Sequence, residues 1–235
     1  DAASAIEVPA GAIDDEVSPV HLATGNMPAL TSGQFARLPF NPERHIERIH
    51  AALISGSRDY FSKMNFTQAV LGSSGGIDSA VAIALAVEAL GPEQVHAVLM
   101  PSPFSSGHSV KDATLLSENL GNPYQVIRID QVYEAFLSTL GPVFKGLPFG
   151  LAEENIQARS RGNILMSLAN KFGYILLNTS NKSELSTGYG TLYGDMAGGL
   201  SVLGDVYKTQ VYALARYINS AKPLIPENIL VKAPS

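Results

Sequence analysis

The sequence predicts an α/β fold, a doubly wound parallel sheet with flanking helices, on three observations. Short apolar runs alternate with longer segments of helical period, in a β-α-β-α-β order. The short runs are continuously apolar, as strands covered on both faces are. One of them leads through a loop of glycines and serines directly into an apolar helix. These features predict parallel strands joined by helices, in a Rossmann-like arrangement.

Residues 1–42 predict a linker or extended arm, because prolines and glycines are scattered through them without a sustained period. From Pro42 to Phe61 apolar residues recur near helical spacing, which predicts an amphipathic helix leading into the core. We therefore expect one large domain over residues 43–235. Since the chain opens at Asp1 and stops at Ser235 without a closing element, we expect a piece of a longer protein, truncated at its C-terminus.

The remaining elements follow from apolar runs and their punctuation by Gly, Pro or Asn. The predicted strands are 69–71, 95–100, 126–129 and 174–177, and the predicted helices are 79–90, 109–120, 130–140, 153–171 and 208–218. Helix 79–90 is apolar nearly all round and is closed by Gly91 and Pro92, a stop signal. We expect it to be a central helix packed on the sheet.

Composition excludes several classes of function. With 46% hydrophobic and 16% charged residues, the chain is an ordinary globular sequence. A net charge of −5 lacks the basic footprint of nucleic-acid binding, so we expect no nucleic-acid partner. No apolar run is long enough to cross a bilayer, which predicts no membrane association and a cytoplasmic location by default. The absence of cysteine excludes disulfides, thiolate metal sites and a cysteine nucleophile.

The loop after the first strand carries the predicted chemistry. It reads Gly72, Ser73, Ser74, Gly75, Gly76, Ile77, Asp78 and Ser79. Its three glycines allow positive φ angles and a close approach of backbone N–H groups to one point. The helix beginning near Ser79 adds its positive dipole end, so the loop suits a polyphosphate. The serines can donate hydroxyl hydrogen bonds to phosphate, and Asp78 is better explained as a magnesium ligand.

The loop has neither the Gly-Lys-Ser/Thr ending of the common P-loop nor the three-glycine dinucleotide fingerprint, so neither interpretation applies. A simple tight turn is the alternative for any two glycines alone. The complete run Ser74–Ser79, however, resembles the pyrophosphate-binding signature of the N-type ATP pyrophosphatases. That group includes NAD, GMP and asparagine synthetases, and the resemblance implies their adenine nucleotide alpha hydrolase-like fold.

Longer sequence blocks narrow the resemblance to one member of that group. Residues 153–163, 181–185 and 190–199, together with 100–106, are similar to the synthetase domain of glutamine-dependent NAD synthetases. Leu192 stands where the shorter, ammonia-only relatives carry lysine. The resemblance implies conversion of nicotinic acid adenine dinucleotide (deamido-NAD) to NAD with ATP, Mg²⁺ and ammonia, releasing AMP and pyrophosphate. It also implies a homodimer or a larger homo-oligomer.

The predicted chemistry requires little covalent work from the protein. A carboxylate resists ammonia, whereas the mixed anhydride formed by transfer of AMP does not. The protein must align two anionic substrates and stabilise the departing pyrophosphate. Asp78 and Glu184 are plausible magnesium ligands, and with Lys208 they are the candidate catalytic residues. By resemblance, Thr179 and Lys208 contact ATP, whereas the dinucleotide is contacted by Asn155, Arg159, Glu184, Tyr189, Gly190, Thr191 and Leu192.

Each assignment has a structural alternative. Glu184 could simply cap the helix that follows Asn181. Arg159 and Arg161 lie two apart on one helix and point to different faces, so only one of them need face the site. Lys208 lies near a helix start, where an anionic partner would offset an unfavourable dipole interaction. The histidines show no metal-ligand spacing and are interpreted as structural or surface residues, with His108 the least certain.

Three positions depart from the family pattern: Ser73, Ala152 and Ser180 stand where leucine, threonine and glycine are usual. Glutamine-dependent members carry a nitrilase-like domain with a catalytic cysteine, and this chain has none, so free ammonia is its expected nitrogen source. Two rival functions remain: another adenylating amidotransferase, such as a GMP synthetase, and a nucleotide-binding module without turnover.

Overall fold

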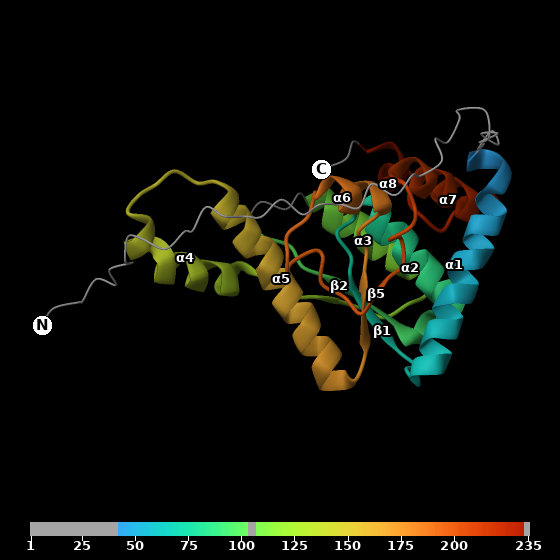
Figure 1. The fold of residues 1–235 in the computed structure, drawn as a ribbon, viewed down its shortest axis with the longest axis horizontal. Coiled ribbons are helices and arrows are strands. Elements are labelled where there is room, and N and C mark those ends of the chain that lie inside the picture. The colour runs from blue at the N-terminus through green and yellow to red at the C-terminus, as the bar shows by residue number, and fades with distance from the viewer. Residues whose placement is uncertain (1–41, 103–106, 233–235) are drawn as a thin grey trace, which may run out of the picture. The chain divides into compact units, whose positions relative to one another are not determined.

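Five parallel strands form the sheet of the computed structural model, which describes residues 42–102 and 107–232. The strands are β1 (Ala69–Gly72), β2 (Val95–Leu99), β3 (Tyr124–Val126), β4 (Ile175–Asn178) and β5 (Leu200–Ser201). Their order is β3-β2-β1-β4-β5, with every neighbouring pair parallel. The predicted doubly wound parallel sheet is therefore confirmed (Figure 1).

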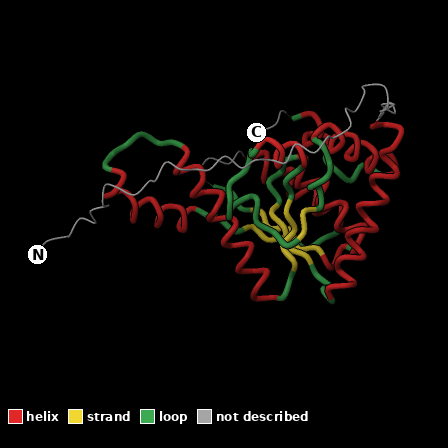
Figure 2. The backbone as a smooth tube through the Cα atoms, in the orientation of Figure 1, coloured by secondary structure: helices red, strands yellow, loops and turns green. Residues whose placement is uncertain are grey.

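Helices lie on both sides of this sheet, as Figure 2 shows. They are α1 (Pro42–Met64), α2 (Ile77–Leu90), the 3₁₀ turn η1 (Pro92–Gln94), α3 (Gly107–Leu120), α4 (Asp130–Phe144), α5 (Leu151–Phe172), α6 (Lys182–Thr187), α7 (Lys208–Ala221) and α8 (Glu227–Val231). In the part of the chain that the structure describes, no helix combines the length and the apolar character needed to cross a membrane.

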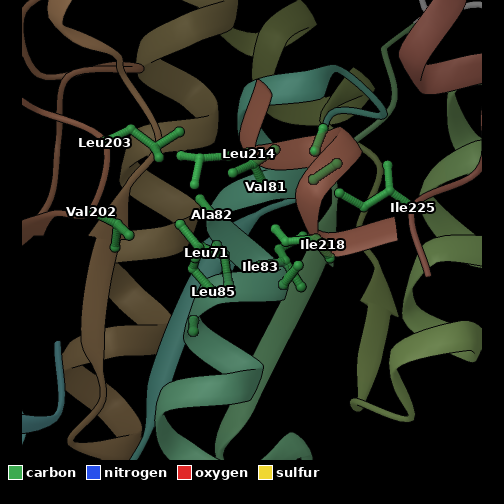
Figure 3. Packing of buried hydrophobic residues seen from close by; sticks show 14 of the residues in the cluster. Leu71, Val81, Ala82, Ile83, Leu85, Val202, Leu203, Leu214, Ile218 and Ile225 are labelled. Atoms are coloured by element: carbon green, nitrogen blue, oxygen red, sulfur yellow. The ribbon is translucent and has the colours of Figure 1, made fainter. Parts of the chain in front are cut away.

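Helix α2 is the centre of the larger core, as predicted. Nine of its residues are buried, because α1 and α7 cover it on the side away from the sheet. Figure 3 shows Val81 and Ile83 of α2 among Leu71 of β1 and Leu214 of α7. The opposite face of the sheet packs a smaller cluster under α5. The sheet is thus covered on both faces, which explains its continuously apolar strands.

Several boundaries differ from the predictions. The third strand is Tyr124–Val126 rather than 126–129, because this edge strand has exposed residues and gives no apolar run. Ile127 and Ile129 follow it and still donate backbone hydrogen bonds to Leu99 and Pro101. The central helix begins at Ile77, so Asp78 is inside its first turn. Elements β5 and α8 were not predicted, since two to five residues carry too little periodicity, and α6 was expected only as the helix that Glu184 could cap.

The remaining helices extend beyond their predicted bounds by up to four residues at either end, and α4 continues through Pro142. The predicted arm at 1–42 lies outside the described residues except for Pro42, as do Pro103–Ser106 of the 100–106 block and the chain end at Pro234 and Ser235.

Candidate active site

A cavity of about 420 Å³ opens at the carboxyl ends of β1, β2 and β4. The strand order reverses between β1 and β4, and open α/β sheets bind ligands at such a switch point. Its walls come from the loop after β1, the end of β2, the middle of α5 and the segments after β4. Four of the predicted site residues line it: Gly72, Ser73, Ser74 and Thr179.

The loop between β1 and α2 is held tightly at Gly75. This residue has φ +76°, and a Cβ at its position would overlap the carbonyl oxygen of Ser109 in α3. The expectation of positive φ is confirmed here and wrong for Gly72 and Gly76, because Gly72 ends β1 and Gly76 is the extended N-cap of α2 with φ −92°. Of the three glycines in this loop, Gly75 is therefore the one whose backbone conformation favours glycine.

The serine hydroxyls of this loop bond mainly to the loop itself. Ser79 Oγ donates to the Gly76 carbonyl oxygen (3.0 Å) and accepts from the Ser74 N–H (3.3 Å), while Ser74 Oγ accepts from the Gly76 N–H (3.2 Å). Ser73 Oγ is buried without a hydrogen-bond partner among the described residues. The Ile77 side chain is in the core. The first N–H groups of α2 have no intrahelical acceptor, so the backbone offers the donors for an anion.

A cluster of three charged side chains lies beside the loop. Lys208 Nζ forms an ion pair with Asp78 Oδ2 and lies 3.9 Å from Glu184 Oε1. Asn181 Nδ2 donates to the other Asp78 oxygen at 2.8 Å. The three side chains are between 19% and 28% exposed, so they are shielded and still reachable. The anionic partner expected for Lys208 at the start of α7 is thus Asp78.

Helices α6 and α7 place this cluster through their N-termini. Asn181, the buried N-cap of α6, accepts from the Glu184 N–H at 3.1 Å, and Glu184 Oε2 accepts from the Asn181 N–H at 3.2 Å. Ser183 Oγ accepts from the Lys208 N–H at 3.1 Å, which joins the two helix starts. Glu184 therefore caps the helix, as the alternative held, and also presents its second oxygen to Lys208.

Burial raises the pKa of the Glu184 carboxyl above its usual value, and the Asp78 charge adds to this rise, although the Asn181 N–H and Lys208 oppose it. Two partly desolvated carboxylates near one ammonium form a donor set suited to a hard cation. Among residues 42–102 and 107–232 no group of three or more His, Cys, Asp or Glu side chains could hold a metal alone. A metal ion at Asp78 and Glu184 would therefore also need oxygen atoms from a bound ligand.

The residues predicted to contact the dinucleotide meet between α5 and the segment after α6. Thr191 Oγ1 donates to Asn155 Oδ1 at 2.7 Å, and Arg159 Nε donates to the Leu192 carbonyl oxygen at 3.2 Å. Tyr189 and Leu192 are 75% and 63% exposed, so their side chains are presented outward. Gly190 lies between them in sequence and packs against Met196. Residues 189–192 follow Glu184 closely in sequence, and none of this group lines the cavity.

Sequence reasoning missed three polar residues, Asn178, Asn181 and Asp195, and it selected Arg159 over the alternative, Arg161. Arg161 lines the cavity, whereas Arg159 is exposed, so the two arginines do face differently. Asn178 at the end of β4 donates to the carbonyls of Asp195 and Ala197, and Asp195 accepts from the Thr191 N–H at 2.6 Å. Asn181 was detectable, because Asn followed three positions later by Glu is a capping signature. The others carry no local signal. None of the described histidines lines the cavity.

The chain is similar to known proteins over most of its length. The profile of the NAD synthase family matches residues 49–235. The glutamine-dependent NAD(+) synthetase of Synechocystis sp. is 51% identical over 208 residues, which cover 88% of this chain and 37% of that protein. The chain therefore spans little more than a third of that relative's length.

Two solved structures are similar as well. The glutamine-dependent NAD+ synthetase from Acinetobacter baumannii, in complex with ADP, has a TM-score of 0.79 and 46% identity, covering 81% of this chain and 36% of that one. The NMN synthetase from Francisella tularensis has a TM-score of 0.72 and 33% identity, covering 83% and 76%. The profile match extends over most of the chain and includes the anion loop and the charged cluster. The chain belongs to the NAD synthase family.

Proposed function

We propose that this domain catalyses ATP-dependent amidation of deamido-NAD to NAD, with release of AMP and pyrophosphate. The observation that carries the proposal is the contact of Lys208 with both Asp78 and Glu184, next to an anion loop at the switch point of the sheet. An ATP-cleaving ligase needs charge stabilisation at the leaving pyrophosphate, and these residues can supply it. The relative from Acinetobacter baumannii was solved with ADP, which supports a nucleotide in this cavity.

The loop and Lys208 act first in the proposed reaction. The free N–H groups at the start of α2 bind the β- and γ-phosphates, and Thr179 contacts ATP from the end of β4. The substrate carboxylate attacks the α-phosphorus, the bond to the β-phosphate oxygen breaks, and the Lys208 ammonium stabilises the charge that develops on pyrophosphate. Ammonia then opens the mixed anhydride and releases AMP.

Asp78 and Glu184 are the residues that would hold Mg²⁺. They fit the ion because Mg²⁺ takes one or two protein carboxylates together with substrate phosphates. Burial raises the pKa of Glu184, so a bound cation would favour its ionised form. The ion neutralises phosphate charge when it is bound. Asn181 orients Asp78 for this role by donating to Oδ1.

We assign the dinucleotide to the surface formed by Asn155, Arg159, Glu184 and residues 189–192. Asn155 and Thr191 bond each other, and Arg159 fixes the Leu192 carbonyl, so the backbone of this segment is ordered before a ligand arrives. The exposed Tyr189 ring can stack on an aromatic ring of the substrate. Ammonia is the proposed nucleophile at this site, and the cytoplasm is the proposed compartment.

A substrate panel tests the proposal. Purified protein is incubated with ATP, Mg²⁺ and ammonium, together with deamido-NAD, the deamidated mononucleotide or xanthosine monophosphate. NAD formed only from deamido-NAD is the expected outcome. Product from the mononucleotide would favour an NMN synthetase activity, as named for the Francisella tularensis relative. Product from xanthosine monophosphate would favour a GMP synthetase, and nucleotide binding without any product would favour a module without turnover.

We further propose that the chain forms a homodimer through the face of α4 and α5. Seven large apolar side chains are exposed there or beside it: Val132, Phe136, Val143, Leu147, Leu151, Met166 and Phe172. An open groove of about 610 Å³ runs between the two helices, lined in part by Ile164 and Leu168. Figure 1 shows α4 beside α5 and away from the sheet. Apolar surface of this extent marks an interaction site.

Sedimentation equilibrium of the Phe172→Glu variant tests this interface. Phe172 is 59% exposed on α5, and Val231, 69% exposed on α8, provides a matched control. We expect Phe172→Glu to shift the protein toward monomer and Val231→Glu to leave the dimer intact. A monomeric wild type, or an unchanged Phe172→Glu dimer, would contradict the assignment.

A further inference from the structure

Arg161 occupies an unusual position in the cavity wall. It lies on α5, half-buried, and its Nε donates to the Met100 carbonyl oxygen at 3.1 Å, just beyond the end of β2. The neighbouring Gly162 has no room for a Cβ, which would come within 2.7 Å of the Tyr193 carbonyl oxygen. The backbone that carries Arg161 is therefore held close to the segment after α6, and Arg161 itself lines the cavity.

The guanidinium of Arg161 has no counter-ion among the residues that the structure describes. No carboxylate there comes within the 4.0 Å that defines an ion pair with it, and the bond from Nε is its one hydrogen bond to these residues. Burial lowers its pKa from the usual value. A desolvated cation with unused donors is costly unless a ligand supplies acceptors. The structural role at Met100 uses only one of its five N–H groups.

The lining of the cavity indicates which part of a ligand reaches Arg161. The anion loop contributes Ser73 and Ser74 to this lining. Apolar residues Val98, Leu99 and Leu165 line the cavity as well, and Leu165 lies one helical turn from Arg161 on α5. A nucleotide with its phosphates at the loop can place its base among these apolar residues. The planar guanidinium suits a heteroaromatic base, because it can stack on the ring or donate to ring nitrogens.

We propose that Arg161 is the residue that positions the base of ATP in this cavity. The inference rests on the proposed function, which assigns ATP to the cavity, and adds a residue that neither the loop nor the charged cluster includes. Arg161 then acts on ATP affinity, while Lys208 acts on the leaving pyrophosphate. The two roles can be separated by comparing the binding of ATP with that of pyrophosphate, which has phosphates but no base.

Calorimetric titration with Mg-ATP and, separately, with Mg-pyrophosphate tests the inference on wild type, Arg161→Met, Arg161→Lys and Arg216→Met. Arg216 is an exposed arginine of α7 and serves as the control. We expect Arg161→Met to weaken ATP binding by about tenfold or more, because a hydrogen bond to a charged group is lost. Pyrophosphate binding should be unchanged. Arg161→Lys is expected to recover part of the affinity, and Arg216→Met to match wild type. The KM for ATP rises in Arg161→Met more than kcat falls.

Unchanged pyrophosphate binding also shows that the Arg161→Met variant is folded. Equal losses for ATP and pyrophosphate would overturn the inference, since they would assign Arg161 to the phosphates or to the fold alone. Normal ATP binding by Arg161→Met would overturn it as well and leave the proposed function untouched. A wild type that binds pyrophosphate but not ATP would contradict the proposed function itself.

Discussion

Lys208 Nζ pairs with Asp78 Oδ2 although 130 positions separate the two residues in sequence. Lys208 is the first residue of α7 and Asp78 lies in the first turn of α2, so two helix N-termini converge on one site. The acidic residue is favoured at its helix start and the lysine is not. The pair therefore ties the phosphate loop to the C-terminal half of the domain and neutralises part of the charge at the site.

Lys208→Met is expected to lower kcat by about a hundredfold to a thousandfold, the range for removing one donor that stabilises developing charge. Lys208→Arg keeps the charge and should retain more activity. Pyrophosphate release under saturating substrates is the measurement. Equal activities of Lys208→Met and wild type would show that the lysine has no role in the chemistry.

Asn181→Asp separates helix capping from orientation of Asp78. Aspartate is as good an N-cap as asparagine, but it cannot donate to Asp78 Oδ1 and adds a negative charge at a fully buried position. We expect a loss of about 1–3 kcal/mol in the free energy of unfolding, the cost of a buried group left unsatisfied, and a fall in activity. Asn181→Ser, which keeps a capping oxygen without the charge, is the control. Urea unfolding that ranks the serine variant below the aspartate variant would contradict this account.

The raised pKa of Glu184 predicts a pH-dependent stability. Because the folded-state pKa lies above the unfolded value, the ionised carboxylate destabilises the fold above the folded-state pKa. This cost disappears as pH falls below the unfolded value. Glu184→Gln keeps an acceptor for the Asn181 N–H and removes the charge. Without Mg²⁺, its Tm should exceed that of wild type near neutral pH, and the difference should vanish at acidic pH. A Tm difference that is constant with pH would contradict the assignment.

Gly75→Ala tests the close approach of the loop to α3. The φ of +76° and the overlap with Ser109 together predict a loss of about 1–3 kcal/mol in the free energy of unfolding. Gly121 has φ +74° with open space around it, so Gly121→Ala isolates the backbone strain. We expect Gly75→Ala to be the less stable variant and to bind ATP more weakly. Similar unfolding curves and unchanged ATP binding in both variants would argue against a constrained loop.

Sequence patterns predicted the elements with continuous or periodic apolar runs and missed the shortest elements. Strands β1 and β4 and helix α2 were found because their runs are continuous and lie in the core. Strand β3 was displaced because its residues are exposed, and β5 is too short to show a period. The registers that bring β1 beside β4 depend on tertiary packing, which no local pattern encodes.

The same division holds for the site. Asp78 and Glu184 were predicted as a pair and Lys208 as a further candidate, and the structure brings both carboxylates to the Lys208 ammonium. Asn178 was missed and Arg161 was weighed only as the alternative to Arg159, because an asparagine after a strand and an arginine on a helix are ordinary residues until the fold brings them to the cavity. Their roles arise from contacts between segments that are far apart in the chain.

The central claim is that ATP is cleaved between its α- and β-phosphates at the loop that Lys208 and Asp78 flank. The most direct measurement is the set of products formed from ATP with Mg²⁺, ammonium and deamido-NAD, followed in one reaction. The account predicts AMP, pyrophosphate and NAD in equal amounts, with each abolished when deamido-NAD is omitted. ADP and phosphate in their place, or pyrophosphate released without NAD, would contradict it.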